Sequence, residues 1–229
     1  MRLVAVNDKK NQFESILKSD SYYSLKEEIL FQIKNEPFDF DMYSLALDNK
    51  NLKVRQIVAN SITEIPEIFR TKYESLLNDN SYSIKEIALI NLISSFPEQK
   101  VSYLNQTKNI VGFNDKSFEI LWMIYAISTP NYLQNQTELL SKLSNYTSNN
   151  FEFLVRQNAL VALKKLNILK PKNLKDVLEC CLLPNWRNAK WSKEFLTEIL
   201  KDSNIKNEYQ SLLNGLPELK KNMLIRFLK

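Results

Sequence analysis

The sequence contains no histidine and only two glycines among its 229 residues. Without histidine, the chain cannot form a Ser-His-Asp triad, an H-E-x-x-H zinc helix or an imidazole general base. Gly112 and Gly215 lie too far apart to belong to a G-x-G-x-x-G loop or to a G-x-x-x-x-G-K-[ST] phosphate-binding loop. These counts exclude the common nucleotide-binding and metallohydrolase sites, and we predict no catalytic, cofactor-binding or metal-ligating residue in this chain.

Scarce glycine also argues against a β-rich fold, because tight hairpins and bulges need residues that adopt positive φ easily. The two cysteines, Cys180 and Cys181, are adjacent, which suits neither a disulfide framework nor a C-x-x-C metal site. We interpret them as a buried pair of reduced thiols. No apolar run approaches the roughly 18 residues of a membrane span, and the apolar stretch at the start is too short for a signal peptide.

Two short segments recur along the chain. DSYYSLKE at 20–27 returns as DNSYSIKE at 79–86, and LKVRQIVANSI at 52–62 returns as FLVRQNALVAL at 153–163. Aligning them places Leu25, Val54, Ile84 and Val155 at equivalent positions, and we add Ile120, after SF at 117–118, as a fifth anchor. The successive spacings of the five are 29, 30, 36 and 35. Internal repetition at such a period is typical of arrays of small supersecondary units.

From these anchor positions, apolar residues continue at helical intervals, as expected for the buried stripe of an amphipathic helix. The predicted stripes are Leu25, Ile29 and Ile33; Val54, Val58, Ile62 and Ile65; Ile84, Ala88, Leu92 and Phe96; and Val155, Ala159, Leu163 and Leu166. The prolines Pro37, Pro66, Pro97 and Pro130 follow the repeated helices. Proline can end one helix and begin the next, so we expect second helices at 67–78 and 98–108.

Two helices per repeat predict an all-α chain of some fourteen helices in about seven pairs. We expect a right-handed α-solenoid of HEAT/armadillo-like helix pairs, an α-α superhelix, with residues 1–229 forming a single domain. MRLVAV at the start reads as part of a repeat helix rather than as a polar capping repeat. We therefore expect an exposed hydrophobic patch near residues 1–17.

Most repeats carry an acidic or amide residue before the anchor and a base just after it. The pairs are Asp20 with Lys26, Asp48 with Arg55, Asp79 with Lys85, and Asn150 with Arg156. One interpretation is a ladder of bases for phosphate. We favour the structural interpretation, in which the acid caps a helix or turn and the base braces neighbouring repeats.

Positive charge concentrates toward the C-terminus. Residues 164–229 hold 14 Lys and Arg against 7 Asp and Glu, whereas residues 1–163 hold 17 against 19. In WRNAKWSK at 186–193, Trp186 and Trp191 alternate with bases, a pattern that can bind nucleic acid through phosphate contacts and stacking. Tryptophans at this spacing on a helix more often pack between helices, and we predict that role for both.

Several stretches between residues 78 and 200 carry a family resemblance: SYSIKEIALINL (81–92), FPEQ (96–99), YLNQTKNIVGFNDK (103–116), LW (121–122), TPNY (129–132), LSNYTS (143–148), VRQNAL (155–160) and NLKDVLE (173–179). Together they resemble the C-terminal helical domain of gluzincin zinc aminopeptidases, alanyl-aminopeptidase-like enzymes of the Bacteroidetes type. Such enzymes bind one Zn²⁺ through H-E-x-x-H and a downstream Glu, and remove N-terminal residues by attack of a zinc-activated water. None of those motifs occurs here, so no catalytic residue carries over.

The resemblance implies a C-terminal fragment of a larger peptidase, with no zinc and no activity of its own. Its partners would be the catalytic domain of the same polypeptide, whose active-site cavity it helps to enclose, and the peptide substrates of the parent enzyme. Two alternatives stay open. One is a free-standing HEAT-like protein–protein scaffold. The other is a DNA-binding helical-repeat protein, which the slightly acidic first two-thirds of the chain disfavours, because a DNA cradle needs a basic face along most of its length.

Overall fold

The chain is all-α in a computed structural model that describes residues 2–19, 22–34, 39–132 and 136–228. Within these ranges it forms fourteen α-helices and three short 3₁₀ helices, with no β-strand. The all-α part of the predicted fold class is therefore confirmed, and the number of α-helices in the described ranges agrees with the expected fourteen. The helices fall into two compact units, Met1–Asn109 and Ile110–Lys229.

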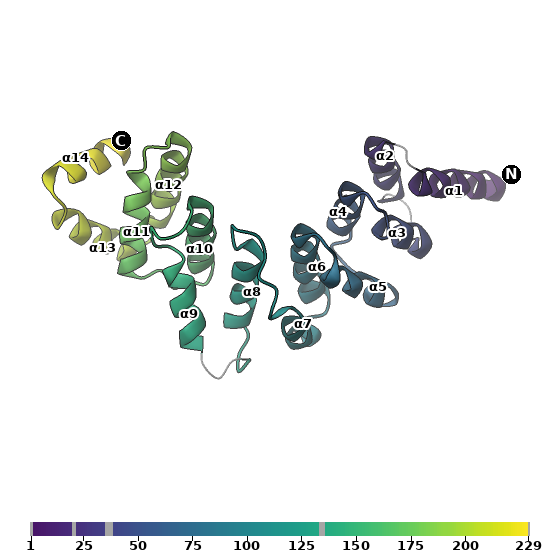
Figure 1. Cartoon of the computed structure of the whole chain (residues 1–229), viewed down its shortest axis with the longest axis horizontal. Helices are drawn as coiled ribbons and strands as arrows, with labels where there is room; N and C mark the ends of the chain where they lie inside the picture. Colours follow the sequence, from purple (N-terminus) through teal and green to yellow (C-terminus); the bar gives the residue numbers. More distant parts are fainter. Residues whose placement is uncertain (1, 20–21, 35–38, 133–135, 229) are drawn as a thin grey trace. The chain divides into compact units, whose positions relative to one another are not determined.

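Unit 1 contains the first seven α-helices and all three 3₁₀ helices (Figure 1). They are α1 (Arg2–Lys18), α2 (Tyr23–Lys34), α3 (Phe40–Leu47), α4 (Leu52–Ser61), η1 (Glu67–Phe69), α5 (Arg70–Glu74), η2 (Ser75–Asn78), α6 (Tyr82–Ser95), η3 (Pro97–Gln99) and α7 (Lys100–Thr107). Short polar side chains fix some of the helix starts. Asp39 accepts a hydrogen bond from the backbone N–H of Met42 at 3.1 Å, and Asn51 accepts one from that of Lys53 at 2.9 Å.

In unit 1, α2, α4 and α6 contact one another in that order (Figure 1), and the core lies between these helices and α3, α5 and α7. Val54, Val58 and Ile84 are fully buried, so the predicted stripes of α4 and α6 are confirmed. The expected stripe of α2 is wrong at Leu25, which is 46% exposed, while Lys26 beside it is buried. This helix is turned so that the Lys26 ammonium, rather than Leu25, faces α1. The side chain of Ile33 lies outside the described residues.

The segments after Pro66 and Pro97 are helical at the predicted places, although they are not continuous α-helices. Residues 67–78 form a 3₁₀ turn, one turn of α-helix and a second 3₁₀ turn. Residues 97–107 form a 3₁₀ turn and then α7. Short 3₁₀ turns are frequent at helix ends, where proline interrupts the regular hydrogen-bond pattern. Pro37 lies outside the described residues.

Unit 2 contains the remaining seven helices. They are α8 (Ser117–Ile127), α9 (Gln136–Asn145), α10 (Phe153–Lys165), α11 (Pro171–Cys181), α12 (Trp186–Ile199), α13 (Ser203–Asn214) and α14 (Glu218–Leu228). The anchors Ile120 on α8 and Val155 on α10 are buried, as predicted. The C-terminal helices share one core cluster, whose largest members are Phe195 and Tyr209. That cluster joins the five helices from α10 through α14 into one packed body.

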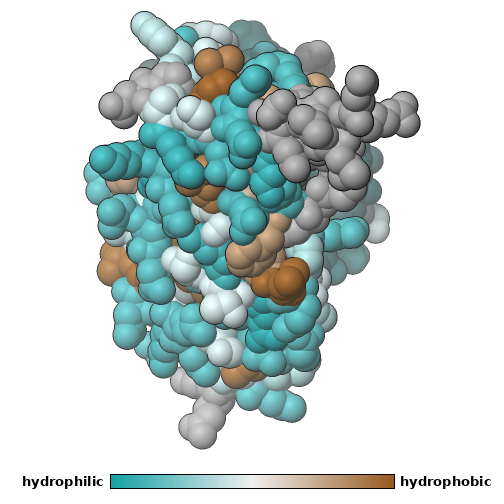
Figure 2. All heavy atoms as spheres, turned by 90° about the vertical axis from the view of Figure 1, so that its right-hand side faces the viewer, coloured by the Kyte–Doolittle hydropathy of each residue, from teal (hydrophilic) through white to brown (hydrophobic). Residues whose placement is uncertain are grey.

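The hydrophobic patch expected near residues 1–17 falls largely outside the side chains that the structure describes. The side chains of residues 1–9 lie outside the described part of the chain, and Leu17 is buried. The face drawn in Figure 2 is mostly hydrophilic, with its hydrophobic side chains in small separate groups.

None of the described helices combines the length and the apolar character that crossing a membrane would require. The single-domain organisation stays a prediction.

Candidate functional site

The aromatic and basic segment 186–193 forms the first two turns of α12. Asn185 begins this helix: its side-chain oxygen accepts hydrogen bonds from the backbone N–H groups of Arg187 at 3.0 Å and Asn188 at 3.4 Å. An asparagine at this position satisfies N–H groups that have no partner inside the helix. Trp186 is therefore the first helical residue, at the edge of the packed body.

The two tryptophans of this segment have different surroundings. Trp191 lies between aromatic rings, stacked on Phe195 at 5.0 Å and meeting Phe153 edge-on at 5.7 Å between ring centroids. Trp186 is 68% exposed. The prediction of packing between helices is confirmed for Trp191 and wrong for Trp186. Five residues of α-helix rotate a side chain by about 140°, so the two indoles cannot share one face.

One exposed cation stands beside the Trp186 ring, and a second follows one helical turn later. The guanidinium carbon of Arg187 lies 5.5 Å from the ring centroid. Lys190 is four residues from Trp186 and three from Arg187, which places the three residues next to one another on the helix surface. The ammonium of Lys190 lies 4.0 Å from Glu194, and both side chains are about two-thirds exposed, at 67% and 65%. We name Trp186, Arg187 and Lys190 the Trp186 patch.

A second polar constellation lies inside unit 2, around Thr147. The Thr147 hydroxyl donates to the carboxylate of Asp176 and accepts a hydrogen bond from the amide of Asn173 at 3.1 Å. Arg156 donates to the backbone carbonyl oxygens of Thr147 at 3.0 Å and Asp176 at 3.2 Å. All four side chains are buried. We name them the Thr147 cluster; it links the segment after α9 to α10 and α11.

The Thr147 cluster has the properties of a structural element rather than of a reactive site. Its donors and acceptors are matched within the protein, and no member is exposed to a ligand in solution. Buried polar groups need such matching because an unpaired one costs about 1–3 kcal/mol. Sequence reasoning identified Arg156 and missed Asn173 and Asp176. The sequence feature that marks Asn173 and Asp176 is their position as polar residues within the otherwise apolar buried stripe of α11.

Three of the four recurring bases brace helix ends, as the structural interpretation predicts. Lys26 on α2 donates to the carbonyl oxygens of Leu17 at 3.1 Å and Ser19 at 2.6 Å, at the end of α1. Arg55 on α4 donates to the carbonyl oxygen of Asn49, after α3, at 2.8 Å. Arg156 makes the equivalent contact with the carbonyl oxygen of Thr147, after α9. These carbonyl groups lie at or just beyond the helix ends, where the backbone has no intrahelical partner, and the cations supply one.

The predicted acid–base pairs are only partly right. Asp79 pairs with Arg55 of the preceding repeat, and Asp48 pairs with Lys72. The ammonium of Lys85 lies 5.3 Å from the centroid of the Tyr82 ring. Asp20 lies outside the described residues. The acids therefore connect successive repeats rather than the base of their own repeat, a relationship that sequence spacing alone does not reveal.

The adjacent cysteines are free and buried, as predicted. Burial raises the pKa of the Cys180 thiol to about 11 and that of the Cys181 thiol to about 12. A nucleophilic cysteine needs a lowered pKa and access to substrate. Both groups are therefore neutral thiols at physiological pH and serve as apolar core residues.

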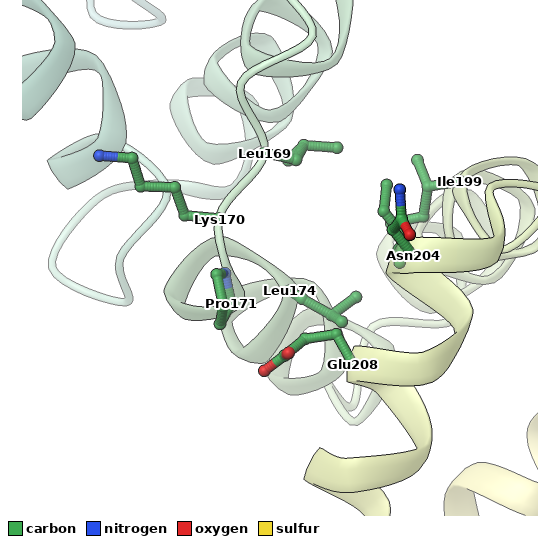
Figure 3. A pocket seen from close by; sticks show the side chains of 8 residues that line it. Leu169, Lys170, Pro171, Leu174, Ile199, Asn204 and Glu208 are labelled. Carbon is green, nitrogen blue, oxygen red and sulfur yellow. The ribbon is translucent and has the colours of Figure 1, made fainter.

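A cleft of about 190 Å³ opens between the start of α11, the end of α12 and the start of α13. Its wall includes the apolar side chains of Leu169, Leu174 and Ile199. Figure 3 shows the Glu208 carboxylate beside Pro171, whereas the ammonium of Lys170 points away from the cleft. The cleft has room for a small apolar group and does not adjoin the Trp186 patch.

No group of three or more Cys, Asp or Glu side chains suited to a metal ion occurs among the described residues, and the chain has no histidine. Searches against family models, curated proteins and solved structures found no match to this chain.

Proposed function

We propose that this chain is the non-catalytic C-terminal helical domain of a zinc metallo-aminopeptidase, packing on the catalytic domain and helping to enclose its active-site cavity. The parent enzyme would hold the zinc and remove N-terminal residues from peptides. In this proposal the helix pairs continue as a right-handed, HEAT-like α-solenoid.

The recurring brace supports the solenoid part of the proposal. Lys26, Arg55 and Arg156 follow equivalent anchor positions, and each satisfies a carbonyl group just beyond the end of the preceding helix. A binding site seldom needs the same contact in successive repeats, whereas stacking does. Helices α2, α4 and α6 also lie against one another in chain order, as repeats that contact only their neighbours would.

The observation that carries the proposal is where the family resemblance falls in the fold. The quoted stretches contain residues that join helices. Among them are Tyr103, which donates to Glu74 at 2.9 Å, and all four members of the Thr147 cluster. Asn91, in the first stretch, donates to the carbonyl oxygen of Ile62 at 3.1 Å, just beyond the end of α4. A resemblance carried by such residues is expected between chains that share a helical fold.

The chemistry of the chain is compatible with a supporting role. With no histidine, it cannot complete an H-E-x-x-H site, and its only thiols are buried and neutral. The zinc site, the substrate amine site and the attacking water would all belong to the catalytic domain. Residues of this chain would contribute shape and surface to the enclosed cavity.

Hydrolysis of aminoacyl-nitroanilides tests the proposal on the purified chain. We expect no turnover above the spontaneous rate, with or without added Zn²⁺, because the residues that bind and activate zinc are missing. An established aminopeptidase, assayed in parallel, confirms that the substrates and the metal are competent. Turnover by the chain alone at a comparable rate would refute the assignment.

A further inference from the structure

We infer that the Trp186 patch binds single-stranded nucleic acid, with a base stacked on the Trp186 indole and phosphates held by Arg187 and Lys190. The inference rests on the surface of α12 and is independent of the proposed function. It follows from the unexpected exposure of Trp186.

The exposed indole is the first requirement. A tryptophan that is 68% exposed offers a ring to a flat partner, while Arg187 stands beside it at 5.5 Å. Nucleic acid bases stack on aromatic rings without sequence preference, because every base has a π-face. An arginine next to the ring adds a cation to the same platform. The ring of Trp191, about one and a half turns later, is stacked on Phe195 and so does not offer that face to a base.

Charge is the second requirement. Arg187 and Lys190 are exposed, and Glu194, 4.0 Å from Lys190, is the one acid between residues 180 and 197. An exposed pair at this distance contributes little to stability, so a phosphate can replace Glu194 as the partner of Lys190 at little cost. The patch also belongs to the basic unit, since residues 110–229 hold 17 Lys and Arg against 11 Asp and Glu.

The surroundings of the patch favour single-stranded nucleic acid over a duplex or an acidic helix. A duplex cradle would need a basic face along most of the chain, and residues 1–109 hold 14 Lys and Arg against 15 Asp and Glu. An acidic amphipathic helix would need an apolar groove, and the α11–α13 cleft has no lining residue within the patch. A single strand needs only a stacking surface and a few cations, within a site of about 4–16 nucleotides.

Fluorescence anisotropy with a labelled oligo-thymidine of about twelve nucleotides tests the inference on the full chain. We expect binding at about 50 mM salt that weakens steeply by about 200 mM. Trp186→Ala should weaken it about tenfold, and Trp186→Phe should restore most of the affinity, because phenylalanine retains a stacking ring. The double variant Arg187→Ala/Lys190→Ala should reduce the slope of log K against log salt by about 1.4, since each phosphate contact contributes about 0.7.

The matched control is Lys172→Ala/Lys175→Ala, which removes two exposed cations at the same three-residue spacing from α11. This control should leave the salt slope unchanged. The inference is overturned if the oligonucleotide does not bind at low salt, if Trp186→Ala binds as the wild type does, or if both double variants lose affinity equally. Tighter binding of an acidic peptide of the same charge would also overturn it, and would identify the patch as a protein-docking surface. Circular dichroism of each variant establishes that the fold is retained.

Discussion

Arg55 and Asp79, 24 residues apart, form a two-point ion pair between successive repeats of unit 1. The guanidinium Nε lies 2.8 Å from one carboxylate oxygen, and a terminal guanidinium nitrogen lies 3.1 Å from the other. The side chains are 16% and 9% exposed. Arg55 also binds the carbonyl oxygen of Asn49, and Asp79 accepts from the N–H of Ser81 at 2.8 Å. The pair therefore joins the turn before α4 to the turn before α6.

Removing this carboxylate should destabilise the chain. In Asp79→Ala, the Arg55 guanidinium keeps its largely buried position and loses its charged partner, and Ser81 loses its turn contact. We expect a loss of about 2–4 kcal/mol in the free energy of unfolding, measured in urea. The control is Asp48→Ala, which breaks the ion pair to Lys72 at the same separation of 24 residues. Asp48 is 65% exposed, so its loss should cost less than about 1 kcal/mol. Equal effects would show that Arg55–Asp79 is no stronger than a surface pair.

The Thr147 cluster should respond to loss of a single hydroxyl. Thr147→Val preserves the shape of the side chain but removes the hydroxyl that donates to the buried Asp176 carboxylate, while the Asn173 amide keeps only Ser144 as its acceptor. The expected loss is about 1–3 kcal/mol. Thr197→Val is the matched control, because its hydroxyl donates to the carbonyl oxygen of Lys193 at an exposed position. We expect Thr197→Val to change the free energy of unfolding by no more than about 0.5 kcal/mol, while Thr147→Val lowers it clearly. Equal effects of the two substitutions would contradict this prediction.

The two tryptophans should differ in stability and in quenching. Trp191→Ala removes a ring packed between Phe153 and Phe195 and should cost about 3 kcal/mol. Trp186→Ala should change the free energy of unfolding by no more than about 0.5 kcal/mol, because its ring is exposed. Iodide should quench less of the fluorescence of Trp186→Ala than of the wild type. Strong destabilisation by Trp186→Ala would show that the ring is packed in solution.

The buried thiols predict a loss of stability at alkaline pH. An ordinary thiol pKa is 9.0, whereas burial raises the pKa of Cys180 to about 11 and that of Cys181 to about 12. Above pH 9 the unfolded chain releases thiol protons that the folded chain retains, so the free energy of unfolding falls as pH rises toward 11. Cys180→Ala/Cys181→Ala should show a shallower fall between pH 9 and 11 in the same urea titrations. An unchanged slope would mean that these thiols do not contribute to it.

Helical periodicity predicted much of the fold because burial of an apolar stripe is a local property of the sequence. Val54, Ile84 and Val155 are buried as their spacing predicts. The pattern failed at Leu25, where a lysine binding two carbonyl groups replaces an apolar anchor. Periodicity counts apolar residues and does not anticipate a buried cation whose partners lie on another helix.

The candidate site was less predictable, because it depends on contacts between distant residues. The segment at 186–193 was identified from its composition, but exposure of Trp186 depends on where Asn185 starts the helix. The partners of Asp79 and Asp176 lie more than twenty residues away. Their roles follow from how the helices pack, which a repeat alignment cannot show.

The size of the native gene product tests the central proposal most directly. An antibody raised against residues 1–229 would detect the product in its source cells, and mass spectrometry of the captured protein would identify its peptides. The proposal predicts a longer polypeptide with an H-E-x-x-H segment upstream of this chain. A native product consisting of these 229 residues alone would contradict it.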